Sequence, residues 1–252
     1  MNTLLKTTLL GLFFGTFGTS IGGIIGALLN IKSNKIMSFI LELAAGLMTS
    51  IICFELIPEA LEISSITNSI FGIIIGVLSM IMCDNIVNKK LKNEKNTLLK
   101  TGLIVGIGLA IHNFPEGLAI GSGFGASLKL GYTLAIAIAF HDIPEGISMS
   151  VPMKNGGMSK KKAIIYTMIS GVTTGIGAFF GGIFGNISTS LIGISLSFAA
   201  GAMLYIVSGE LIPESKKIYK GRFSILGILV ALPSCYRLLA WIAPSFLPFV
   251  QY

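Results

Sequence analysis

The sequence predicts an all-α, polytopic membrane protein with eight transmembrane helices in a 3+2+3 inverted-repeat arrangement. Three observations support this fold class: the apolar composition, the length of the apolar segments, and the distribution of lysine and arginine. Apolar residues make up 53% of the 252 residues and charged residues only 12%, whereas soluble domains carry about 25% charged residues. With a mean hydropathy of +0.85, the chain cannot cover a water-facing surface, so we expect a lipid bilayer to be its solvent.

Eight apolar segments follow one another along the chain. Each has about 22–27 residues, enough for a helix to cross a hydrocarbon core of about 30 Å. The first segment lies where a signal peptide would, but it is apolar over about 20 residues and has no clear cleavage site, so we expect a retained helix. Together the segments form one expected transmembrane domain over residues 1–252, with helices at approximately 4–29, 36–58, 66–88, 98–123, 128–152, 162–187, 190–213 and 223–249.

Lysine and arginine gather in alternate loops, while the loops on the other side hold only Lys129. Basic loops stay in the cytoplasm, so both termini are expected outside a cell membrane. The clustering between apolar runs argues against a nucleic-acid partner despite the net charge of +7. The loops after the first, third, fifth and seventh segments hold 15 of the 18 basic residues: Lys32, Lys35, Lys89, Lys90, Lys92, Lys95, Lys100, Lys154, Lys160, Lys161, Lys162, Lys216, Lys217, Lys220 and Arg222.

The three cysteines, Cys53, Cys83 and Cys235, lie far apart in apolar segments and form no C-x-x-C pair. We interpret them as small buried hydrophobes rather than as disulfide partners or thiolate metal ligands.

Two internal repeats organise the chain. Residues 41–60 share the frame L-x-x-A-A-G-x-M and E-L-I-P-E with residues 196–215, and H-N-F-P-E-G at 112–117 returns as H-D-I-P-E-G at 141–146. By the expected topology, the two copies of each repeat run in opposite directions. Inverted repeats with interrupted helices near the midplane are typical of secondary transporters. A duplication that only built a stable bundle is the alternative, and the retained charged residues argue against it.

The histidine motifs place candidate ligands near the middle of the membrane. His112 and His141 lie about 14 and 13 residues into their segments, which is roughly 20 Å deep at 1.5 Å per residue. His112 and Glu116 are four residues apart and share a helix face, and the second motif repeats this spacing. The candidate metal ligands are His112, Asn113, Glu116, His141, Asp142 and Glu145.

Three carboxylates at this depth require a positive partner. An ionised carboxylate at the bilayer centre costs about 3 kcal/mol or more unless it is paired, and no Lys or Arg lies close to the motifs. A divalent cation is the expected partner. Imidazole nitrogen with carboxylate oxygen suits Zn²⁺ and similar ions, whereas Ca²⁺ and Mg²⁺ sites use oxygen alone. The alternative is a polar cluster that only joins two helices.

The prolines of the two motifs predict interrupted helices. Pro115 and Pro144 cannot donate a backbone hydrogen bond, so the carbonyls of Ile111 and Phe140 lose their helical donors. Irregular backbone is tolerated in a membrane where it lines a polar cavity, and freed carbonyls there can help to dehydrate an ion.

Through these motifs and the overall plan, essentially the whole chain resembles the ZIP (Zrt/Irt-like) metal transporters, more narrowly their prokaryotic zinc uptake and GufA-like branch. The resemblance implies eight transmembrane helices with both ends outside. It also implies import of Zn²⁺, and of Fe²⁺, Mn²⁺ or Cd²⁺, into the cytoplasm. A homodimer and an elevator-like sliding of one helix set past another are further expectations from the family.

The resemblance also assigns residues. It implies that His112, Glu116, His141 and Glu145 form the principal site, and that Asn113 and Asp142 belong to an adjacent second site, with both glutamates bridging. Several bacterial members add a glutamate from the sixth helix, where this chain has Thr174. A weaker second site and a single metal both stay open. Met48 is a possible thioether ligand by the same resemblance, or a core residue.

Further carboxylates flank the expected site. Glu55, Glu59 and Glu62 fall near the expected outer face, and Glu210 and Glu214 near the inner face. They attract cations on the way in and out, or they are helix-end carboxylates in the headgroup region.

Two other functions compete with transport. A membrane-embedded metal-dependent hydrolase could use an open metal position to activate water, but the chain has no HExxH or GxSxG motif. A structural bundle or a metal sensor without transport is the third hypothesis. We expect no enzyme activity and no cofactor, because the bound metal is the transported ion itself.

Overall fold

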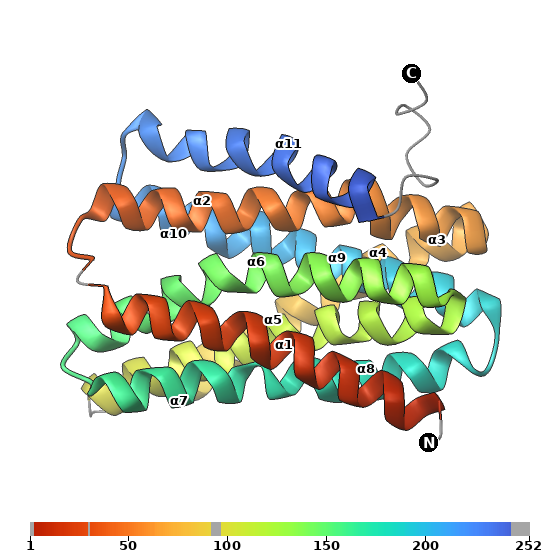
Figure 1. Ribbon diagram of the computed structural model, residues 1–252, viewed down its shortest axis with the longest axis horizontal. Coiled ribbons are helices and arrows are strands. Elements are labelled where there is room, and N and C mark those ends of the chain that lie inside the picture. The colour runs from red at the N-terminus through yellow and green to blue at the C-terminus, as the bar shows by residue number, and fades with distance from the viewer. Residues whose placement is uncertain (1–2, 30, 92–96, 243–252) are drawn as a thin grey trace.

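The computed structural model describes residues 3–29, 31–91 and 97–242. These residues form long helices along the major axis of the molecule, with no strand among them (Figure 1). The elements are α1 (Thr3–Leu28), α2 (Asn34–Ile51), η1 (Ile52–Leu56), α3 (Ile57–Ile63), α4 (Ile66–Leu91), α5 (Thr97–Ala126), α6 (Leu128–Asn155), α7 (Lys160–Ser170), α8 (Val172–Gly185), α9 (Thr189–Ile206), η2 (Val207–Leu211), α10 (Ile212–Ile218), η3 (Arg222–Ser224) and α11 (Ile225–Ile242).

The predicted all-α polytopic class is confirmed. Six helical stretches in the described part of the chain are long and apolar enough to cross a membrane, and they coincide with six of the predicted segments. The other two predicted segments correspond to α5 and α11. Residues 243–249 of the last predicted segment lie outside the described residues, as do Lys92 and Lys95.

The helices alternate in direction, so the connections fall at two ends of the bundle (Figure 1). The connections α1–α2, α6–α7 and α10–α11 share one end with the last turn of α4 and the first turn of α5, and we call it the basic end because most of the lysines lie in the loops on this side. The start of α1, the connection α5–α6 and the helix α3 lie at the other end, which we call the α3 end.

Helix contacts follow the inverted repeat. The packing of α5 on α8 has its counterpart in α6 on α1, and α4 on α9 corresponds to α11 on α2. The contact of α2 with α6 likewise corresponds to that of α9 with α5. Two copies of one three-helix unit therefore surround the central pair α5 and α6.

Close helix packing around α5 and α6 depends on glycine. A Cβ on Gly117 would collide with the backbone carbonyl of Thr174 on α8, and a Cβ on Gly146 with the carbonyl of Thr19 on α1. Small residues let membrane helices approach to backbone contact. The motif glycines therefore hold α5 and α6 tightly against their neighbours.

The prediction that Pro115 and Pro144 interrupt their helices is wrong. Both prolines lie inside continuous α-helices, α5 and α6. A proline removes one intrahelical hydrogen bond, and each helix continues past this loss, with a glycine in backbone contact with a neighbouring helix two residues later.

The irregular backbone lies instead at the two E-L-I-P-E sequences. There the chain forms the π-helices η1 and η2, in which the N–H of Ile57 donates to the carbonyl of Ile52, and that of Ile212 to Val207. A wider turn accommodates the proline that follows, and π-helical turns often occur at functional sites. The repeat has thus preserved an unusual backbone twice.

Candidate metal site

The antiparallel pair α5 and α6 brings both histidine motifs together in the protein interior. Four residues form a compact cluster: one ligand atom from each lies within 4.8 Å of the others, and all four are buried. These four residues, called the ligand cluster below, are Glu116, His141, Asp142 and Glu145.

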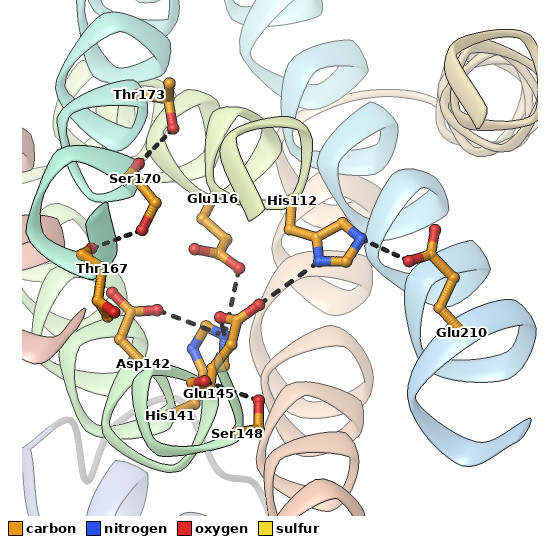
Figure 2. Close-up of polar contacts among 10 residues, drawn as sticks. All are labelled: His112, Glu116, His141, Asp142, Glu145, Ser148, Thr167, Ser170, Thr173 and Glu210. Atoms are coloured by element: carbon orange, nitrogen blue, oxygen red, sulfur yellow. Dashed lines mark hydrogen bonds and ion pairs between the residues drawn. The ribbon is translucent and has the colours of Figure 1, made fainter. Parts of the chain in front are cut away.

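His141 lies at the centre of the ligand cluster (Figure 2). Its Nε2 atom is 3.2 Å from Oε1 of Glu116, 3.5 Å from Oδ1 of Asp142 and 3.6 Å from Oε2 of Glu145. Three carboxylate groups therefore converge on one imidazole nitrogen, at nearly the spacing of about 3.3 Å that neighbouring ligand atoms have around a tetrahedral zinc ion.

The carboxylates of the ligand cluster lack hydrogen-bond donors. Both oxygens of Glu116, Asp142 and Glu145 are buried without a hydrogen-bond partner. A buried polar atom without a partner is strongly unfavourable, and such atoms in a native protein call for a ligand or a functional explanation. A divalent cation bound among these oxygens would satisfy them and offset their charge.

His112 lies at the edge of the ligand cluster and points in two directions. Its Nδ1 is 3.5 Å from Oε1 of Glu145, and its Nε2 is 2.9 Å from Oε2 of Glu210. Figure 2 shows the imidazole between the ligand cluster and Glu210 of η2. His112 thus bridges from the central helix pair to the surrounding helices.

Glu210 was predicted to lie near the inner face. In the structure its carboxylate contacts His112 at the edge of the ligand cluster. The π-helix η2 directs its carboxylate to His112, and about a third of this side chain is exposed (32%). The sequence did contain a signal, because E-L-I-P-E is repeated. The distance between residues 112 and 210 depends on how α5 packs on α9, which sequence spacing does not reveal.

The other predicted site residues surround the ligand cluster. Asn113 is fully buried, and neither polar atom of its amide has a hydrogen-bond partner. Thr174 on α8 is also fully buried with an unpartnered Oγ1. Near it, Ser170 donates to the carbonyl of Thr167 and Thr173 donates to the carbonyl of Ser170 (Figure 2), so both hydroxyls are already engaged.

Met48 and the carboxylates at the α3 end occupy different environments. Met48 is fully buried in the hydrophobic core, so its role as a thioether ligand stays a prediction. Glu55 on η1 and Glu59 on α3 are buried, whereas Glu62 is exposed.

Comparisons with known proteins point to zinc transporters. The family model described as ZIP Zinc transporter matches residues 88–232, a range that includes both histidine motifs. The Zinc transporter ZupT of Chlorobium chlorochromatii is 30% identical, over 87% of this chain and 91% of that protein. The ZupT of Campylobacter jejuni is 33% identical over 89% of this chain and 92% of its own length. The ZupT of Clostridium perfringens is 42% identical, over 55% of this chain and 50% of that protein.

Proposed function

The chain belongs to the ZIP zinc transporter family, and from this membership we propose that it carries Zn²⁺ across a membrane through the site on α5 and α6. One observation supports the site above all others. Three buried carboxylates and a buried imidazole converge within 4.8 Å, and the carboxylate oxygens have no hydrogen-bond donor. The transported cation would supply the positive charge that these carboxylates lack.

The donor set fits zinc. Neutral imidazole and carboxylate oxygen are both good Zn²⁺ ligands, and four of them complete a tetrahedral shell. We propose that Glu116, His141, Asp142 and Glu145 hold the ion. Fe²⁺, Mn²⁺ and Cd²⁺ accept similar ligands, and their relative affinities depend on geometry and availability.

His112 and Glu210 would give the ion a path out of the ligand cluster. His112 touches Glu145 of the ligand cluster with one nitrogen and Glu210 with the other. A metal that replaces the shared proton on Nε2 would move toward Glu210 without losing all protein ligands at once. Asn113 is placed to supply an amide oxygen beside the ligand cluster.

We propose a single tightly bound ion. The fully buried Thr174 is neutral, and a second divalent ion needs more negative charge than Asn113 and Thr174 add. Three carboxylates and one divalent ion leave a net charge of −1, which a second divalent ion would turn into a net positive charge in the membrane interior.

The orientation in the membrane follows from charge at the two ends. Basic loops remain in the cytoplasm, so we propose that the basic end is cytoplasmic and that the termini are outside a cell membrane. From the family resemblance we propose that transport is import. We also propose one transmembrane domain over the whole chain, a homodimer, and a sliding of α1, α5, α6, α7 and α8 against the other helices. An enzymatic role gains no support from the family, and we propose that the chain is not an enzyme and uses no cofactor.

The experiment uses purified protein in liposomes that contain a zinc-sensitive dye. Glu145→Ala and His112→Ala should lower the Zn²⁺ flux by about a hundredfold, because each removes a group that touches the ion. Asp84→Asn is the matched control: this carboxylate on α4 accepts a hydrogen bond of 2.8 Å from the Tyr205 hydroxyl and belongs to neither the ligand cluster nor the proposed path, so its flux should equal the unmodified protein's. A wild-type signal no larger than in empty liposomes would exclude transport. Zinc binding without flux would favour a metal sensor, and intact flux in both site variants would exclude the site.

A further inference from the structure

The inverted repeat pairs residues of the site across the molecule. Glu55 in E-L-I-P-E of η1 is the counterpart of Glu210 in E-L-I-P-E of η2. In the same way His141 on α6 is the counterpart of His112 on α5. The contacts correspond as well, because α2 packs against α6 as α9 packs against α5.

Only one of these two corresponding pairs is formed in the structure. Glu210 meets His112 at 2.9 Å, and its side chain is 32% exposed. Glu55 is only 2% exposed, and its Oε1 has no hydrogen-bond partner. The Nδ1 of the fully buried His141 has no hydrogen-bond partner either. The protein therefore holds two buried, unpartnered polar atoms in the places that correspond to a formed contact.

Buried polar atoms without a partner are unfavourable. A second conformation in which these atoms have partners would account for their presence. Inverted repeats give a transporter two conformations in which the repeats exchange their environments. A contact made by one repeat in the first conformation is then expected in the other repeat in the second.

We infer that Glu55 is a metal-contacting residue of the opposite access state, in which it meets the ion and His141 as Glu210 meets His112 in this structure. The structure itself is the state in which the ligand cluster communicates with the basic end through the partly exposed Glu210. When the site opens to the α3 end, Glu210 becomes buried and Glu55 becomes accessible. This inference rests on the proposed zinc transport.

The carboxylates at the two ends explain why Glu55 would receive the ion and Glu210 release it. Glu55 on η1 is followed by Glu59 and Glu62 on α3, so three carboxylates succeed one another toward the α3 end. The corresponding positions at the basic end are Glu210, Glu214 and Lys217. Lys217 lies 3.1 Å from Glu214, so the path at the basic end finishes on a cation and would attract a metal ion less.

A purely structural role for Glu55 makes a different prediction. Lys129 at the start of α6 contributes positive potential at Glu55, so the glutamate could serve only to hold α6 by this attraction. In that case Lys129→Gln would reproduce the defect of Glu55→Gln.

The test measures uptake of radioactive Zn²⁺ by whole cells that express the full chain, in which every copy has the same orientation. The variants are Glu55→Gln, Glu210→Gln and Lys129→Gln, with rates normalised to the amount of folded protein. Glu55→Gln should raise KM about tenfold with a smaller change in kcat, because it removes a group that meets the incoming ion. Glu210→Gln should mainly lower kcat, and Lys129→Gln should leave KM near the wild-type value.

A wild-type KM in Glu55→Gln, or the same KM increase in Lys129→Gln, would overturn the inference while leaving zinc transport in place. If the unmodified chain takes up no zinc above control cells, the proposed function itself fails. A thiol cross-linking measurement gives a second readout if Glu55→Gln does not fold. In a chain without its native cysteines, Glu55→Cys with His141→Cys should be bridged by a short bifunctional thiol reagent, as Glu210→Cys with His112→Cys should be. Bridging of the second pair alone would contradict the inference.

Discussion

Two groups of buried carboxylates in this protein are compensated in opposite ways. Glu42 on α2 is 1% exposed, and its Oε1 lies 2.7 Å from Nζ of Lys216 and accepts hydrogen bonds from Ser215 and Ser224. Among the described residues, the carboxylates of the ligand cluster form ion pairs with histidines and not with lysine or arginine. Their oxygens accept no hydrogen bond.

The difference separates a carboxylate that the protein compensates from carboxylates that it leaves uncompensated. Glu42 joins α2 to α10 and η3 at the basic end, and its positive partner belongs to the protein, so nothing needs to be added. The carboxylates of the ligand cluster lack such a partner and are held in place by the glycine-packed helices around them. A buried charge whose compensation is left open is what an exchangeable cation requires.

The largest effect should follow from Glu116→Gln. Loss of one carboxylate from the ligand cluster should lower zinc transport by about a hundredfold. It should also leave the metal-free protein as stable as before or raise its stability by about 1 kcal/mol, because a buried charge without a donor is removed. Thermal unfolding in detergent with and without Zn²⁺ measures both effects, since zinc stabilises only the form that binds it. A lower melting temperature of the metal-free variant would show that Glu116 is structural, as Glu42 is.

An intermediate effect of the opposite kind should follow from Glu42→Gln. Breaking this partly buried ion pair should lower the free energy of unfolding by about 1–3 kcal/mol, while the zinc flux per folded molecule stays unchanged. The side chain of Lys216 is 39% exposed, so its ammonium group reaches water. This limits the loss of stability. The control is the double variant Glu42→Gln, Lys216→Met, which should recover part of the stability. A zinc flux reduced as strongly as in Glu116→Gln would remove the distinction between the two groups.

The smallest effect should follow from Lys217→Gln. Lys217 and Glu214 form an exposed pair three residues apart, with 75% and 52% of their side chains exposed. Such pairs contribute about 0.5 kcal/mol or less, so the melting temperature should hardly change. Increasing the salt concentration should reduce even this difference, because exposed charges are screened. A loss as large as that in Glu42→Gln would show that burial is the wrong basis for the comparison.

The repeat shows that the contacts of Glu42 with Ser215, Lys216 and Ser224 are specific to one end of the molecule. Ser197 occupies the corresponding position in α9, and its hydroxyl donates to the carbonyl of Gly193 in its own helix. Ala60 and Leu61 correspond to Ser215 and Lys216. The basic end is therefore held by charge and hydrogen bonds, whereas small and apolar residues occupy the same positions at the α3 end.

The sequence by itself determined the helices, their alternating direction and the main members of the candidate site. These features are local: apolar length defines a membrane helix, and a spacing of four residues places His141 and Glu145 on one face. The repeat of H-x-x-P-E-G then indicated that α5 and α6 act together. For the same reason the class of the fold could be predicted without the structure, as could the convergence of Glu116, His141, Asp142 and Glu145, although the expected principal site had His112 in the place that Asp142 takes in the cluster.

The tertiary structure alone decided the features that join distant parts of the chain. His112 reaches Glu210, 98 positions away, and Glu42 reaches Lys216; both contacts depend on helix packing that no local spacing encodes. The continuity of α5 and α6 through their prolines was also beyond the sequence, because local spacing does not show which backbones pack against a helix. Local spacing determines the lengths and faces of the helices, whereas the packing of helices against one another determines the partners of the buried charges.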